Sequence, residues 1–159
     1  MKETITFGDV LLVPAYSTVT SRKQVDLSVD MGKGISLSCP FISSPMDTVT
    51  ESDMAKVMSA AGGLGIIHRY NAIETQCDEV KKSSADNVGA AIGVSGDFEE
   101  RACALFDAGA NILCVDIAHG HHVLMKNALA RLRSIFGDAI HIMAGNVATL
   151  QGFNDLADW

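Results

Sequence analysis

The feature that most constrains the fold is a short apolar run rich in β-branched residues, followed by a turn and then by a segment with helical spacing. This pattern recurs about five times along the 159 residues. The expected strands are residues 40–47, 64–68, 88–94, 111–116 and 141–145. The expected helices follow them at residues 50–63, from 71 onward, and at 97–109, 124–135 and 149–159. Strands that are apolar on both faces and alternate with helices indicate parallel βαβ units with the helices outside.

Polar residues and glycines mark the expected ends of these helices. Thr50, with Asp53 three residues later, resembles a capping box, in which the two side chains bond free backbone amides at the start of a helix. Asn71 and Asp97 open the next two helices in the same way, each with a glutamate three residues on. Gly62 is expected to end the first helix, because glycine is favoured just after a helical C-terminus.

Two architectures fit parallel βαβ units: an open doubly wound sheet and a TIM (β/α)8 barrel. A doubly wound dinucleotide-binding sheet usually carries GxGxxG between its first strand and helix. This chain has SSPMDTVTE there, and its GGLG at residues 62–65 precedes a strand. We therefore predict an α/β protein with the TIM barrel fold. The chain would supply about the first five βα units, as the N-terminal portion of a single catalytic domain over residues 1–159.

Five units are three fewer than a closed barrel requires. An open barrel exposes two unpaired strand edges and part of its core. Trp159 lies inside an apparent helix without a stop signal. We expect the chain to be part of a longer protein, or its missing units to come from another chain.

The charge balance argues against several classes of partner. The chain has 19 Asp plus Glu against 12 Lys plus Arg, and its formal net charge of −7 repels nucleic acid and anionic membrane surfaces. No apolar run approaches the roughly 18 residues of a membrane-spanning helix, and the start does not resemble a signal peptide. We expect a soluble, cytoplasmic protein without nucleic-acid or membrane partners. The four cysteines are too widely spaced for a zinc knuckle, and we expect all four to be buried.

Polar side chains follow the expected strands and, in a barrel, would converge on one edge. They are mostly hydroxyl, amide, carboxylate and imidazole groups, which suit a polyhydroxylated organic ligand. In chain order the residues after the strands are Ser43, Ser44, Met46, Asp47, His68, Arg69, Asn71, Ser95, Asp116, His119, His121, His122, Gly145 and Asn146. Asp116 ends an apolar strand, so its carboxylate must meet water or a ligand, and its paired oxygens suit a ribose diol. Asn146 fits either a turn or an amide clamp on a ligand, and Met46 fits either core filling or contact with a base.

The segment CVDIAHGHH at residues 114–122 contains three histidines. Three interpretations are open: a metal site, a general base, and helix capping or solvation. The HGHH run lacks the i, i+4 spacing of the HExxH zinc motif, and we expect no metal site. For His121 and His122 we expect capping of the following helix or exposure to water.

Six segments occur in the order TFGDVLLVPAYSTVTSRKQVDL, SSPMDTVTE, GGLGIIHRYNAIETQ, GAAIGV, VDIAHGHH and IMAGNVAT. Together they cover nearly all of the chain and resemble the IMP dehydrogenase and GMP reductase family. The resemblance implies a (β/α)8 barrel, usually tetrameric, that acts on a purine nucleoside monophosphate. It also implies a nicotinamide cofactor and a covalent intermediate on a cysteine.

The same resemblance implies roles for individual residues. The family's nucleotide-contacting serine, methionine and asparagine fall on Ser44, Met46 and Asn146. Its dinucleotide-binding stretch falls on Asp116, Ala118 and His119. Asp116 would engage the nicotinamide ribose, and the His119 ring could stack on adenine.

Two family features are missing from the sequence. The family's nucleophilic cysteine lies in a loop resembling GxGxGSxC after the sixth strand, and none of the four cysteines here has that context. We therefore expect no catalytic residue within this chain, no activity from the chain alone, and a monovalent-cation site outside it. The paired regulatory CBS modules are missing as well, since KKSSADNVGAAIGV runs straight through their insertion point.

The resemblance leaves two reactions and one non-catalytic alternative. A dehydrogenase oxidises IMP to XMP with NAD in guanine nucleotide synthesis, whereas a reductase deaminates GMP to IMP with NADPH. SPMDTVTE, GGLGIIH and AHGH resemble the dehydrogenase versions, while the missing modules favour a reductase. We predict an IMP dehydrogenase-like homotetramer that uses NAD. The alternatives are a GMP reductase, which would use NADP, and a non-catalytic half barrel.

Overall fold

Five parallel strands form one sheet in the order β3, β4, β5, β6 and β7, which is also their order along the chain. A computed structural model describes residues 5–159, and the first four residues of the predicted domain, Met1 to Thr4, lie outside this range. The strands are β3 (Ile42–Ser43), β4 (Leu64–Ile67), β5 (Val88–Ile92), β6 (Ile112–Asp116) and β7 (His141–Gly145). The helices are α1 (Ser52–Ala60), α2 (Ile73–Ser83), α3 (Phe98–Asp107), α4 (Val123–Phe136) and α5 (Leu150–Asp158).

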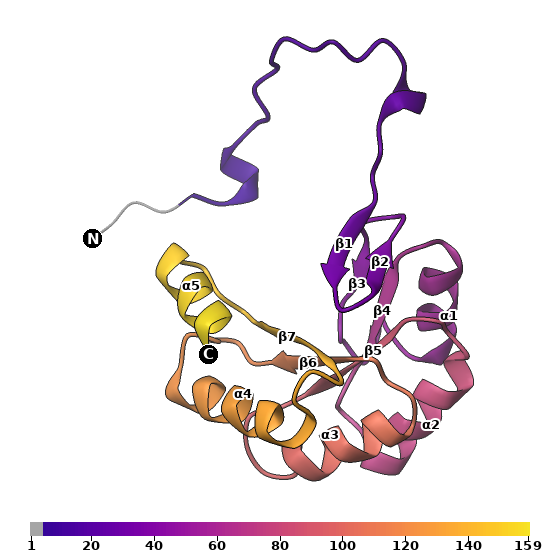
Figure 1. Cartoon of the computed structure of the whole chain (residues 1–159), viewed down its shortest axis with the longest axis vertical. Coiled ribbons are helices and arrows are strands. Elements are labelled where there is room, and N and C mark those ends of the chain that lie inside the picture. The colour runs from indigo at the N-terminus through magenta and orange to yellow at the C-terminus, as the bar shows by residue number, and fades with distance from the viewer. Residues whose placement is uncertain (1–4) are drawn as a thin grey trace.

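A helix follows every strand of this sheet, and the helices lie along the outer side of the curved sheet (Figure 1). This is the arrangement of consecutive TIM barrel units, and it confirms the predicted fold class. Within the described residues, β3 and β7 are the edge strands and each pairs on one side. The sheet is therefore a half barrel.

Apolar side chains cover both faces of the sheet, which is why the strands read as continuous apolar runs. In β6, Leu113 and Val115 belong to the buried cluster beneath the helices. Ile112 and Cys114 alternate with them and belong to a second buried cluster on the inner face. The sheet thus separates an outer core, packed against helices, from an inner core that faces the interior of the barrel.

A β-hairpin that is not among the predicted elements covers part of the inner core. Its strands are β1 (Val29–Gly32) and β2 (Ile35–Leu37), which pair antiparallel. Ile35 and Leu37 share the inner cluster with side chains from β4, β5 and β6. At the hairpin turn, the Lys33 ammonium forms an ion pair with Asp138, which lies just before the start of β7. The hairpin therefore covers the amino-terminal end of the half barrel and leaves the carboxyl ends of the strands open.

Residues 5–28 form an extended arm that contains two short 3-10 helices, η1 (Phe7–Asp9) and η2 (Arg22–Gln24). The arm leaves β1 and arcs away from the sheet and helices (Figure 1). Leu11 and Leu12 within it are 94% and 99% exposed. The arm therefore contributes little to either core.

The glycines predicted to end helices are confirmed, whereas two of the three predicted N-cap residues are wrong. Gly62 and Gly109 follow α1 and α3 with φ of +81° and +104°. The N-cap position of α1 is Glu51, whose side chain makes no capping hydrogen bond, and Thr50 is fully buried, with its hydroxyl bonded to the loop before it. Asn71 does not cap α2 either, because that position is taken by Ala72.

Asp97 is the N-cap residue of α3, as predicted, but its side chain makes no capping hydrogen bond. Its carboxylate lies 2.8 Å from the Arg101 guanidinium one turn later. The Asp97 carboxylate therefore binds the buried Arg101 guanidinium instead of the backbone amides at the start of α3.

The expectation of four buried cysteines is confirmed for Cys77 and Cys114 and wrong for Cys103, which is exposed. Cys39 is half-buried. The neighbours of Cys103 on α3, Ala102 and Leu105, are the residues that face the sheet, so the thiol points away from the core. None of the helices formed by residues 5–159 combines the length and apolar character needed to cross a bilayer.

Candidate functional site

The carboxyl ends of the five strands lie at one edge of the sheet, because all five are parallel. Ser44 and Met46 follow β3, Asp116 ends β6, and Asn146 follows β7. The predicted binding residues therefore share one edge. The sheet order places Asp116 and Asn146 on neighbouring strands, whereas β4 and β5 separate them from Ser44 and Met46.

A hollow of about 430 Å³ lies at the ends of β6 and β7. It is lined by Cys114, Val115, Asp116, Met143, Ala144, Gly145, Asn146 and Val147. Asp116 is half-buried and pairs in register with Gly145, the residue before Asn146. Alternation along β6 puts Asp116 on the inner face of the sheet together with Cys114. A carboxylate and an amide therefore line the same hollow.

The thiol in this hollow is not a nucleophile at neutral pH. Burial, followed by the nearby charge of Asp116, raises the pKa of the Cys114 thiol to about 12. A thiol reacts through its thiolate, which is scarce this far below the pKa. Cys114 therefore acts as an apolar wall of the hollow.

The loops after β6 and β7 are joined by backbone hydrogen bonds. The Asn146 amide donates to the carbonyl of Ile117 at 2.8 Å, and the Gly120 amide donates to the carbonyl of Asn146 at 2.7 Å. A Cβ atom on Gly120 would lie 2.8 Å from that same carbonyl oxygen, so only glycine allows this approach. Ala118 and His119 are exposed between the two anchor points.

The three histidines after β6 have separate environments. His122 is the N-cap of α4, and its Nδ1 accepts a hydrogen bond from the Leu124 amide at 3.1 Å, as predicted. His121 places Nε2 2.7 Å from Oδ2 of Asp155 on α5, so the expectation that it caps a helix or is solvated is wrong. His119 is exposed. Within residues 5–159, no group of three or more His, Cys, Asp or Glu side chains is placed to hold a metal ion.

The loop between β3 and α1 is closed by hydrogen bonds to Thr50. The Thr50 hydroxyl donates to the Ser44 carbonyl at 2.7 Å, and the Thr50 amide donates to the Met46 carbonyl at 3.1 Å. The side chains of Ser44 and Met46 remain exposed, Met46 at 51%. The loop thus has a fixed backbone and free side chains.

His68 and Arg69 follow β4 and connect neighbouring loops in ways that local patterns do not reveal. His68 is buried, with Nδ1 accepting from the Tyr70 amide at 3.1 Å and Nε2 at 3.3 Å from Glu51. The Arg69 guanidinium reaches the Asp116 carbonyl at 3.5 Å, and its buried Nε has no partner within the described residues. A positive charge therefore lies beside the strand that ends in Asp116.

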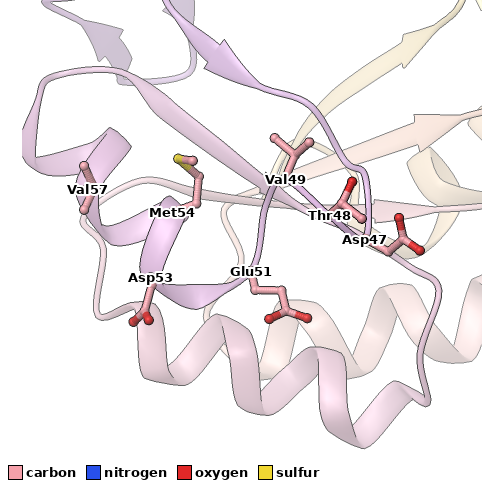
Figure 2. A pocket seen from close by; sticks show the side chains of 7 residues that line it. All are labelled: Asp47, Thr48, Val49, Glu51, Asp53, Met54 and Val57. Atoms are coloured by element: carbon pink, nitrogen blue, oxygen red, sulfur yellow. The ribbon is translucent and has the colours of Figure 1, made fainter.

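A second hollow, of about 450 Å³, lies beside the loop after β3 and the first turns of α1. Figure 2 shows its lining side chains, which are Asp47, Thr48, Val49, Glu51, Asp53, Met54 and Val57. Its three carboxylates would repel a phosphate group. Neither Ser44 nor Met46 lines it, so the candidate site is the edge that carries Ser44, Met46, Asp116 and Asn146.

Comparison with known proteins gives the same family along the whole chain. The family model described as IMP dehydrogenase / GMP reductase domain matches residues 4–159. The inosine-5'-monophosphate dehydrogenase of Nitrosopumilus maritimus is 30% identical over 98% of this chain and 59% of its own length. That of Cryptosporidium parvum is 34% identical over 97% of this chain and 48% of its own length.

A third relative, the inosine-5'-monophosphate dehydrogenase of Staphylococcus saprophyticus, is 58% identical over 51% of this chain. The chain spans about half the length of the first two relatives. A match over residues 4–159, together with the parallel half barrel, shows that the chain belongs to the IMP dehydrogenase / GMP reductase family.

Proposed function

We propose that this chain forms the amino-terminal part of the catalytic barrel of an oxidoreductase that converts IMP to XMP with NAD. The observation that carries the proposal is the shared position of Asp116 and Asn146 in one hollow at the carboxyl edge of the sheet. Barrel enzymes bind their substrates at this edge. The family match and the names of the relatives support the reaction class.

The nucleotide would be bound by Ser44, Met46 and Asn146. The Ser44 hydroxyl and the Asn146 amide each donate and accept hydrogen bonds, which suits ribose hydroxyls, phosphate oxygens and the polar edge of a purine. The exposed Met46 thioether offers a polarizable contact for the flat face of the base.

The cofactor would lie along Asp116, Ala118 and His119. Residues 5–159 provide no hydrogen bond to the Asp116 carboxylate, which is half-buried beside the hollow and is thus available to two ribose hydroxyls. The Arg69 guanidinium, 3.5 Å from the Asp116 carbonyl, adds a positive charge that suits an anionic ligand. These residues fit NAD, which when bound would accept the hydride removed from the nucleotide.

The remaining catalytic parts would lie outside this chain. We place no nucleophile within it. Cys114 is the thiol that lines the hollow, and burial raises its pKa to about 12. The nucleophilic cysteine and a monovalent-cation site would come from the other part of the barrel, and the assembled protein would be a homotetramer. Residues 1–159 would form one portion of a single barrel domain without CBS modules.

GMP reductase is the second candidate function. The observation that favours it is the direct connection between α2, which ends at Ser83, and β5, which begins at Val88, with no inserted module. Such an enzyme would use NADPH and deaminate GMP to IMP. A half barrel that binds nucleotide without catalysis is the non-enzymatic alternative.

Absorbance at the reduced-nicotinamide band tests the proposal on the whole protein that contains these residues, as it is made in the cell. With IMP and NAD, the absorbance is expected to rise. A fall with GMP and NADPH would show the reductase instead. Silence in both mixtures would contradict the proposal and support the non-catalytic half barrel.

A further inference from the structure

We propose that Thr50 is a positioning residue for the purine nucleotide, because it fixes Ser44 and Met46 relative to each other. This inference rests on the proposed function, in which both residues contact the nucleotide. Thr50 itself is fully buried and would touch no ligand.

The side chain of Thr50 is bonded on both sides. Its hydroxyl oxygen lies 2.7 Å from the Ser44 carbonyl oxygen and 2.9 Å from Oγ of Ser43. A hydroxyl has one hydrogen, and a carbonyl oxygen can only accept. The Thr50 hydroxyl therefore donates to Ser44, and Ser43 donates the second bond.

The backbone of Thr50 makes the complementary contacts. Its amide donates to the Met46 carbonyl at 3.1 Å, and its carbonyl accepts from the His68 amide at 3.3 Å. The Met46 amide in turn donates to the Ser44 carbonyl at 2.8 Å. One buried residue thus ties Ser44 and Met46 to each other and to the end of β4.

This role is separate from starting α1. The N-cap position of α1 is Glu51, and the Thr50 hydroxyl bonds Ser44 and Ser43, which lie before the helix. Holding a loop in its binding conformation lowers the entropy lost when a ligand binds. The Thr50 hydroxyl therefore lowers the entropic cost of nucleotide binding at Ser44 and Met46, although Thr50 itself would not touch the nucleotide.

Thr50→Val removes the hydroxyl while keeping the shape of the side chain. The Ser44 carbonyl retains its bond from the Met46 amide, so the variant is expected to fold. Thr50→Ser keeps the hydroxyl and serves as the rescue variant. Thr48→Val is the matched control, because Thr48 is an exposed threonine of the same loop (Figure 2). Its hydroxyl makes no hydrogen bond within residues 5–159.

The test measures the dissociation constants of IMP and NAD by calorimetry on the whole protein that contains this chain, together with KM and kcat. Thr50→Val is expected to weaken IMP binding about tenfold, with NAD binding unchanged, since one buried hydrogen bond is lost. The KM for IMP should rise by a similar factor while kcat changes less. Thr50→Ser and Thr48→Val should bind IMP as the unmodified chain does.

Equal IMP affinity for Thr50→Val and the unmodified chain would overturn the inference while leaving the proposed function intact. Failure of Thr50→Ser to restore binding, or equal loss of IMP and NAD binding, would overturn it too. An unmodified chain that binds neither IMP nor GMP would overturn the proposed function, and this inference with it. If Thr50→Val does not fold, Thr50→Ala is compared with Thr50→Ser, because these two variants differ only by the hydroxyl.

Discussion

The backbone amide of Gly120 donates a hydrogen bond to the carbonyl oxygen of Asn146 at 2.7 Å. This contact joins the loop that would bind the cofactor to the residue that would bind the nucleotide. The two loops follow neighbouring strands, β6 and β7, so the bond extends the pairing of the sheet beyond the ends of the strands. A change in one loop is therefore expected to move the other.

Gly120→Ala tests this junction. The new Cβ would lie 2.8 Å from the Asn146 carbonyl oxygen and 3.0 Å from the Gly145 carbonyl carbon, so the two loops must separate. Overpacking of this kind costs about 1–3 kcal/mol of unfolding free energy, measurable by urea denaturation. Binding of IMP and NAD should weaken together. Gly8→Ala is the control, because among residues 5–159 its Cβ would meet only the Thr6 hydroxyl, at 3.5 Å. Similar behaviour of the two variants would contradict the prediction.

Asp116→Ala is expected to impair cofactor use far more than nucleotide binding. The carboxylate would accept two hydrogen bonds from a ribose, and bonds to a charged acceptor are among the stronger ones, so the KM for NAD should rise roughly tenfold or more. The dissociation constant of IMP should change little. Asp107→Ala, at an exposed carboxylate on α3, controls for the loss of one negative charge. An equal loss of NAD and IMP binding would refute the role given to Asp116.

Arg101 and Arg131 offer a comparison between a buried and an exposed arginine. Arg101 donates to Gln76 Oε1 and to Asp97 Oδ2, both at 2.8 Å, and Gln76 donates onward to the Ala91 carbonyl at 2.9 Å. Arg101→Met would leave the buried Gln76 oxygen without a donor, at a cost of about 1–3 kcal/mol in unfolding free energy.

Arg131 instead pairs with Glu99 at the surface, at 2.7 and 3.0 Å. Arg131→Met should lower stability only slightly, because exposed ion pairs are screened by water and salt. Urea denaturation of both variants measures the loss of unfolding free energy that each substitution causes. Equal midpoints would show that the buried network contributes no more than the surface pair.

The alternation of strands and helices was predictable because the two cores are built from adjacent residues of the same strands. Every residue of β5, from Val88 to Ile92, is buried, so its sequence is apolar throughout. The helices also show their apolar stripe locally. Patterns over a few residues therefore carry enough information for the half barrel.

The site needed contacts that no local pattern contains. In sequence, Thr50 fits a capping box as well as it fits a bond to the preceding loop. Only the position of the Ser44 carbonyl in the folded chain decides where the Thr50 hydroxyl donates. His121 meets Asp155, 34 positions away, and Arg69 reaches the Asp116 carbonyl, 47 positions away. The hairpin of β1 and β2 is not predicted because β1 begins with exposed residues and shows no alternation, and β2 alternates over only three residues.

Cys114 and Cys103 should differ sharply in reactivity. Cys103 is exposed, whereas Cys114 is buried and the pKa of its thiol is raised to about 12, so roughly one molecule in ten thousand carries the Cys114 thiolate at pH 8. Iodoacetamide at pH 8, followed by peptide mass spectrometry, should label Cys103 quickly and Cys114 only after unfolding. Rapid labelling of Cys114 in the folded protein would contradict the buried position of its thiol.

The raised pKa of the Cys114 thiol also has a consequence for stability. The ordinary pKa of the thiol is 9.0, so its contribution is present below pH 9 and is lost as the pH rises toward 12. Cys114→Ala should reduce this alkaline loss of stability, whereas Cys103→Ala should not.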